Sequence, residues 1–140
     1  MLRRYQKEDV KRIVELELST LQTSLGEDML ISELSNPFSY YYVYEEFGLV
    51  IGYISISYDG EIAEVLNFCV DKKYQNKGIG SKMLIEAINL IDPNSVVLEV
   101  RDKNEQAIHV YEKLGFKQIH VRKRYYSNGD NALVLQWERR

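Results

Sequence analysis

Apolar residues recur along this chain at two spacings, and each spacing predicts a different kind of element. Between residues 8 and 21 the spacing is three to four, which is the period of a helix with one buried face. The apolar positions of this stretch are Val10, Ile13, Val14, Leu16, Leu18 and Leu21. Further helices are expected at residues 28–34, from about 82 to 91, and at 104–114, where Gly115 supplies the stop.

Runs of aromatic and β-branched residues predict strands, because such side chains suit a pleated surface. The expected strands are residues 2–5, 40–44, 49–58, 62–70, 95–100, 116–126 and 132–137. Asp59-Gly60 indicates a hairpin turn, and residues 127–130 form the turn of a closing hairpin. The order predicts one α/β domain over residues 1–140. Its sheet is mixed: antiparallel early and parallel around residue 75.

Composition narrows the class of protein. With 140 residues, 45% hydrophobic and 28% charged, the chain fits one globular domain. The net charge of −3 argues against direct nucleic-acid binding. No apolar run approaches the roughly 20 residues of a membrane span, and the N-terminus lacks the apolar core of a signal peptide. One cysteine, Cys69, fits a reducing cytoplasm, and with two distant histidines it argues against zinc.

The most informative segment joins the strand ending at Val70 to the following helix through a loop spaced Gln75-x-x-Gly78-x-Gly80. A loop that enters a helix exposes backbone N–H groups at the positive end of the helix dipole, which is an arrangement that binds phosphate. Glycines let an anion approach the backbone. An ordinary strand-to-helix turn remains the alternative. Four lysines surround the loop, either as a solvated face or to attract a polyanionic cofactor: Lys72, Lys73, Lys77 and Lys82.

Together with the order of elements, this loop and the segment Asn104…Tyr111-Glu112-Lys113-Leu114-Gly115-Phe116 resemble the GCN5-related N-acetyltransferases (GNAT) over essentially the full length. Leu98 to Phe116 and Arg122-Lys123-Arg124-Tyr125-Tyr126 are similar to the RimI branch, the ribosomal-protein-alanine N-acetyltransferases. The resemblance implies the GNAT fold: a mixed, mostly antiparallel sheet with helices on both faces and a splayed pair of central parallel strands. It implies acetyl-coenzyme A as cosubstrate, no metal, and direct transfer to an amine.

The resemblance also implies which residues meet the cofactor. The pyrophosphate would accept hydrogen bonds from the backbone of the loop, which comprises Gln75, Asn76, Lys77, Gly78, Ile79, Gly80 and Ser81. The pantetheine amides would pair with the strand edge at Phe68, Cys69 and Val70, and Asn104 and Tyr111 would contact the same arm. Cys69 is expected to be a small core side chain, because nothing nearby would activate it as a nucleophile.

Resemblance to the RimI branch implies Glu99 as the general base and Tyr111 as the acid that protonates the leaving sulfur. Glu99 interrupts the apolar run 96–100, so burial is expected to raise its pKa. The alternative is an exposed carboxylate paired with Arg101 or a lysine. Glu64 is a rival base, because the histone-acetylating relatives have their glutamate at a matching place, and an ordered water that relays to neither glutamate is the third option. Tyr111 lies two helical turns after Asn104, so both side chains are expected on the same side of the helix. The alternatives are that Tyr111 is a core residue and that Asn104 is a simple helix N-cap.

The acceptor end carries less information. RimI-like enzymes usually have a tryptophan between their first two helices, whereas residues 24–27 contain none. Tyr125 and Tyr126 are acceptor-side residues by resemblance. The favoured acceptor is a protein N-terminal α-amine, possibly of a ribosomal protein. A small amine, such as a polyamine or an aminoglycoside, and a non-catalytic coenzyme A-binding module are the alternatives.

Overall fold

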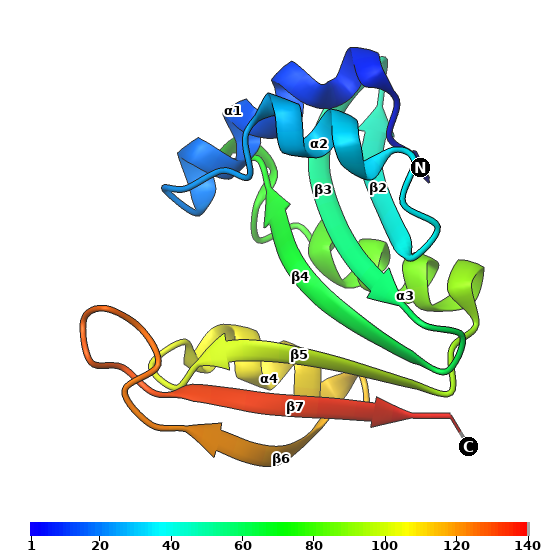
Figure 1. The fold of residues 1–140 in the computed structure, drawn as a ribbon. Helices are drawn as coiled ribbons and strands as arrows, with labels where there is room; N and C mark the ends of the chain where they lie inside the picture. Colours follow the sequence, from blue (N-terminus) through cyan, green and yellow to red (C-terminus); the bar gives the residue numbers. More distant parts are fainter. Residues whose placement is uncertain (140) are drawn as a thin grey trace.

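The computed structural model describes residues 1–139, which fold around one seven-stranded sheet of order β1-β2-β3-β4-β5-β7-β6 (Figure 1). The strands are β1 (Leu2–Arg4), β2 (Ser39–Glu46), β3 (Leu49–Tyr58), β4 (Ile62–Val70), β5 (Ser95–Arg101), β6 (Lys117–Arg122) and β7 (Ala132–Glu138). The helices are α1 (Val10–Thr20), α2 (Glu27–Glu33), α3 (Ile79–Ile91) and α4 (Glu105–Lys113), with 3₁₀ turns at Lys7–Asp9 and Lys72–Tyr74. None of these helices combines the length and apolar character that a membrane crossing requires.

The predicted elements are confirmed, with differences at their ends. The first helix starts with a 3₁₀ turn, so its α-helical part begins at Val10 rather than at residue 8. Strand β6 ends at Arg122, four residues before the predicted end. The chain turns there because Arg124 adopts a left-handed backbone conformation and its N–H donates to the side chain of Asn131. Gly115 follows α4 with φ +102°, as the stop signal predicted.

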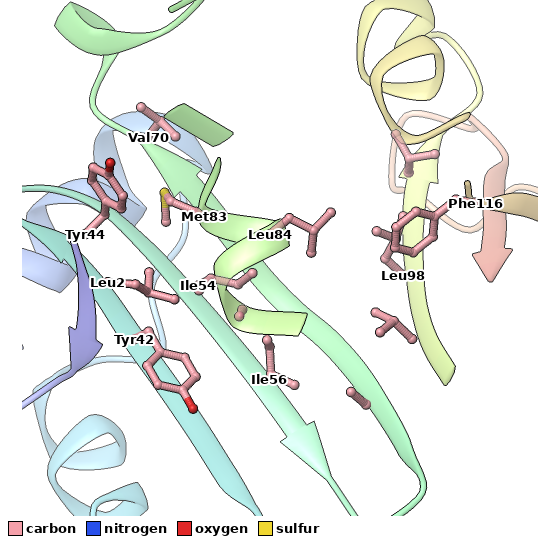
Figure 2. Close-up of a cluster of buried hydrophobic side chains, with 14 of the residues drawn as sticks. Leu2, Tyr42, Tyr44, Ile54, Ile56, Val70, Met83, Leu84, Leu98 and Phe116 are labelled. Carbon is pink, nitrogen blue, oxygen red and sulfur yellow. The ribbon is translucent and has the colours of Figure 1, made fainter. Parts of the chain in front are cut away.

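Helices cover both faces of the sheet, as predicted, and this explains the tyrosine-rich strand β2. Tyr42 and Tyr44 point to the core shared with α3 and α4, while Tyr41 and Val43 point to a second core under α1 and α2. Strand residues alternate between faces, so burial on both sides requires large apolar residues at consecutive positions. Figure 2 shows part of the first core, in which Leu84 of α3 lies on the side facing Leu98 and Phe116.

The sheet opens between β4 and β5, which pair in parallel. These strands pair at Ile62↔Ser95, Ala63↔Val96 and Glu64↔Val97, and beyond these positions they diverge (Figure 1). A bulge in β4 coincides with the divergence, because Ser55 of β3 pairs with Asn67 while the next residue, Ile56, pairs with Val65. A bulge bends its strand and increases the local twist. The splayed central pair is thus confirmed, and a wedge opens toward the loop after β4.

Candidate active site

A pocket of about 370 Å³ lies in the wedge and extends from the end of α1 to α4. It is lined by every cofactor residue predicted from the sequence except Lys77. These are Phe68, Cys69, Val70, Gln75, Asn76, Gly78, Ile79, Gly80, Ser81, Asn104 and Tyr111. Residues as far apart in the chain as Phe68 and Tyr111 therefore reach one cavity, because the divergence of β4 from β5 brings the glycine loop opposite α4.

The loop before α3 presents unused hydrogen-bond donors to this pocket. Within residues 1–139, the N–H groups from Asn76 to Ser81 donate no hydrogen bond to the protein. The first N–H groups of an α-helix have no intrahelical acceptor, and the helix dipole adds positive potential. Gly78 precedes the helix with φ +78°, a conformation that a side chain would strain. The loop can therefore hold a diphosphate.

Two side-chain contacts fix the loop in place. Gln75 Nε2 donates to the carbonyl oxygen of Val70 at 2.9 Å, which ties the loop to the end of β4. Gln106 Nε2, at the start of α4, donates to Asn76 Oδ1 at 2.8 Å. Gly80 also permits close packing, because a Cβ there would lie 3.3 Å from the ring of Phe68. The loop that carries the N–H donors is thus tied to the β4 wall of the wedge and to the α4 wall.

The β4 wall offers a free strand edge. Phe68, Cys69 and Val70 pair with β3 on one side and lie beyond the last residue that pairs with β5. Unpaired backbone groups at an edge are available to a chain of amides such as pantetheine. Cys69 is buried, and burial raises the pKa of its thiol to about 11. The structure therefore supports the expectation that Cys69 packs rather than reacts.

The α4 wall is one face of the helix. Asn104, Ala107, Tyr111 and Leu114 line the pocket at intervals of three and four, and Gln106 and Val110 line it beside them. Asn104 Oδ1 accepts the N–H of Ala107 at 3.2 Å, so the N-cap alternative is correct, and the same residue also lines the pocket. Burial raises the pKa of Tyr111, which keeps the phenol protonated. Ala107 and Leu114 were missed from sequence, although the helical period from Asn104 identifies them.

Glu99 is not the isolated buried carboxylate that the apolar run suggested, and that expectation was wrong. Val96, Leu98 and Val100 are buried against α4, so Glu99 points to the opposite face of β5, with its side chain 25% exposed. Its partner is Arg122 of β6, whose Nε lies 2.9 Å from Glu99 Oε1. Neither Arg101 nor a lysine takes this place. Glu99 lies outside the residues that line the pocket.

Glu64, the rival base, lies on the same face of the sheet as Glu99 but at the closed end of the wedge. It pairs in register with Val97, two residues before Glu99, and its side chain is exposed. Paired residues of neighbouring strands share a face. Glu64 thus lies where β4 and β5 are still joined, whereas Glu99 lies where they have begun to separate.

The connection from β6 to β7 packs beside Glu99. The guanidinium of Arg101 lies over the ring of Tyr126, 3.8 Å from its centroid, and 3.8 Å from a carboxylate oxygen of Asp130. Tyr125 packs edge-on against Tyr126, and Arg122 lies over the ring of Tyr125. The motif Arg122-x-x-Tyr125-Tyr126 therefore forms one stacked cluster on the face that carries Glu99.

The lysines near the loop are exposed. Lys77 does not line the pocket, and its ammonium lies over the ring of Tyr74, 5.7 Å from the centroid. The backbone of Lys77 remains part of the donor loop. Among residues 1–139, no three His, Cys, Asp or Glu side chains gather as metal ligands would.

Comparison with known proteins agrees with this geometry. The model of the acetyltransferase (GNAT) family matches residues 8–116. The chain is 33% identical to the N-alpha-acetyltransferase RimI of Mycobacterium tuberculosis over 138 residues, covering 91% of this chain and 85% of that protein. The sequence-based resemblance is confirmed by this family match.

Solved structures show the same fold. The crystal structure of the ribosomal-protein-S18-alanine N-acetyltransferase from Escherichia coli superimposes with a TM-score of 0.89 at 22% identity, covering 99% of this chain and 92% of that one. The PaiA N-acetyltransferase from Thermoplasma acidophilum, solved in complex with coenzyme A, gives a TM-score of 0.81 at 18% identity, covering 99% of this chain and 98% of that one.

Proposed function

Because this chain belongs to the acetyltransferase (GNAT) family and is an acetyl-coenzyme A-dependent N-acetyltransferase, we propose that its acceptor is the N-terminal α-amine of a protein, with a ribosomal protein as the first candidate. The observation that carries the acetyl-transfer part of the proposal is the wedge between β4 and β5, with free N–H donors at its mouth and a strand edge along one wall. The identity to an N-alpha-acetyltransferase supports the choice of acceptor.

The positions of Tyr111 and Glu99 suit direct transfer. The amine nitrogen attacks the thioester carbonyl carbon, the carbon–sulfur bond breaks, and the sulfur leaves with its electron pair. Tyr111, on the α4 side of β5, donates a proton to that sulfur and recovers one from solvent. Glu99, on the opposite face, accepts the proton released by the amine. Base and acid then act from opposite sides of the reacting carbonyl.

Arg122 has a place in this scheme because it compensates the charge of Glu99 before the acceptor binds. The acceptor enters as an ammonium and offers Glu99 a second cationic partner. An N-terminal α-amine has an ordinary pKa of about 8, so part of it is already deprotonated near neutrality. A partly exposed carboxylate paired with an arginine is therefore a sufficient base for an α-amine, whereas a lysine side chain would demand more of it.

The acceptor can be tested by transfer assays with acetyl-coenzyme A. We expect acetylation of a peptide that begins with alanine, and of its free α-amine only, with little transfer to spermidine or an aminoglycoside. Efficient transfer to the small amines alone would favour the second acceptor class. Coenzyme A binding without any transfer would favour a non-catalytic module.

The choice of base can be tested with two matched variants. Glu99→Gln keeps the shape of the side chain and removes the proton acceptor, so we expect kcat to fall by about 10²-fold or more. Glu64→Gln makes the same change at the closed end of the wedge and should stay within about threefold of the parent. The reverse pattern would transfer the role to Glu64.

We also propose that the enzyme works in the cytoplasm, which the RimI-like relatives and the single reduced cysteine support. Comparison of protein N-termini by mass spectrometry, in cells with and without the gene, would identify the acceptor. A loss of acetylation at one class of N-terminus is the expected result.

A further inference from the structure

Glu17 is a fully buried carboxylate outside the proposed reaction centre. It lies in helix α1 with no exposed surface, and no salt bridge to it occurs within residues 1–139. Burying a carboxylate is costly unless hydrogen bonds satisfy it. An apolar residue would pack at this position without that cost, so the hydrogen bonds of Glu17 are the feature to explain.

The hydrogen bonds of Glu17 join three separate pieces of the fold. Its Oε1 accepts the hydroxyl of Ser24 at 2.7 Å and the N–H of Leu25 at 3.3 Å, both in the connection between α1 and α2. Its Oε2 accepts Asn67 Nδ2 of β4 at 3.0 Å. One carboxylate thus fixes helix α1, the connection after it and strand β4 relative to one another.

The place where Glu17 meets β4 is the bend of that strand. Asn67 directly follows the bulge, and its N–H donates to Ser55 Oγ at 2.9 Å. The three residues after Asn67 line the cofactor pocket as its free strand edge. The other piece that Glu17 holds begins at Leu21, which lines the same pocket. Glu17 therefore contacts both segments that border the pocket on the β4 side without lining it.

We propose that Glu17 is a positioning residue that sets the width of the wedge. Through Asn67 it holds β4 away from β5, and through Ser24 and Leu25 it holds the connection after α1 against that strand. The role rests on hydrogen-bond geometry, because Glu17 does not line the pocket. The proposal relies on the proposed function only for the pocket being the coenzyme A site, and it does not depend on the acceptor.

Two substitutions of Glu17 are expected to change the affinity for coenzyme A differently. Glu17→Ala removes all three hydrogen bonds, so we expect coenzyme A to bind about tenfold more weakly, because small misplacements of a site carry large costs. Glu17→Gln keeps the acceptor oxygen for Ser24 and Leu25, and the Asn67 amide can turn over to accept from the new Nε2. Affinity should therefore return to within about twofold of the parent.

The control is Leu16→Ala, a buried neighbour on the same helix that makes none of these hydrogen bonds. It should lower Tm at least as much as Glu17→Ala while leaving affinity for coenzyme A within about twofold. Affinity is measured by calorimetry on the purified chain, and Tm by circular dichroism. A loss of affinity that simply follows Tm across the three variants would overturn the proposal, as would a Gln variant as weak as the Ala variant.

Amide hydrogen exchange supplies a readout that needs no ligand. In Glu17→Ala we expect faster exchange at Leu25 and at residues 67–70, and no such change in Leu16→Ala. Should Glu17→Ala fail to fold, Asn67→Ala and Ser24→Ala each remove one hydrogen-bonded arm. Asn67→Ala should then weaken coenzyme A binding more than Ser24→Ala, and equal, parental affinities would contradict the proposal. A parent protein that binds coenzyme A but acetylates no peptide would refute the proposed acceptor and leave this test intact.

Discussion

At the scale of single residues, Tyr111 is the group whose chemistry the structure defines best. Burial raises its pKa, so the phenol stays protonated through neutral and mildly alkaline pH. A raised pKa means that the donor is lost only as pH climbs above the ordinary tyrosine value of about 10. We expect Tyr111→Phe to lower kcat by about 10²-fold with little change in coenzyme A affinity. Steady-state kinetics measure kcat and calorimetry measures the affinity for coenzyme A, with Tyr58→Phe as the control variant. A parental kcat in Tyr111→Phe would exclude Tyr111 as the acid.

Cys69 separates direct transfer from a route through an acyl-enzyme. Its thiol has a pKa of about 11, so only about one part in 10⁴ is thiolate at pH 7. We expect Cys69→Ala to keep kcat within about threefold and to lose roughly 1 kcal/mol of stability from the small cavity. Mass spectrometry of the parent mixed with acetyl-coenzyme A alone should find Cys69 unmodified. An acetyl group on Cys69 that an acceptor amine then removes would contradict direct transfer.

At the scale of elements, Gly80 lies in the first turn of α3, where the helix also packs closely against Phe68 of β4. An alanine there favours the helix by about 1 kcal/mol over glycine, but its Cβ would lie 3.3 Å from the Phe68 ring. The helix would then shift relative to β4, and the loop donors with it. We expect Gly80→Ala to leave Tm nearly unchanged and to weaken coenzyme A binding about tenfold. Asn89→Ala, an exposed position of the same helix, should gain stability without loss of affinity. Unchanged affinity in Gly80→Ala would show that the loop tolerates this shift.

Local sequence signals were sufficient to predict most helices and strands and the loop expected to bind phosphate. Turn residues, the helix stop at Gly115 and the Gln75-x-x-Gly78-x-Gly80 spacing each act over a few residues, so sequence alone reveals them. The apolar pattern did not give the buried face of α1 correctly, because it included Leu18, which is exposed, whereas Glu17 at the preceding position is fully buried. A carboxylate on the buried stripe becomes intelligible only when Ser24, Leu25 and Asn67 supply its hydrogen bonds.

Long-range partners of the site residues could not be read from sequence. Glu99 and Arg122 are 23 positions apart and meet because β7 lies between β5 and β6 in the sheet. A hairpin signal predicts that β6 and β7 pair, but it does not determine which of them docks on β5. The burial expected for Glu99 failed for the same reason, because the helix that buries its neighbours covers only the opposite face.

At the scale of the whole molecule, the sheet consists of two parts joined by a short stretch of parallel pairing. Strands β1 to β4 form one part and β5, β7 and β6 the other, with three paired positions between β4 and β5. The core under α3 and α4 also holds the parts together, because Leu84 lies toward Leu98 and Phe116 (Figure 2). A ligand that fills the wedge contacts both parts, so its binding should stabilise the fold as a unit.

Coenzyme A at a hundredfold excess over its Kd should add about 2.7 kcal/mol to the free energy of unfolding and raise Tm by several degrees. If the ligand bridges the wedge, amide exchange should slow at residues 65–70 of β4, at the loop before α3 and along α4. The face near Arg122, where we expect the acceptor, should change little until a peptide is added, because residues 117–126 do not line the pocket. Protection confined to the loop would mean that the diphosphate binds while the rest of the cofactor stays outside, and the wedge would then not be the site of acetyl transfer.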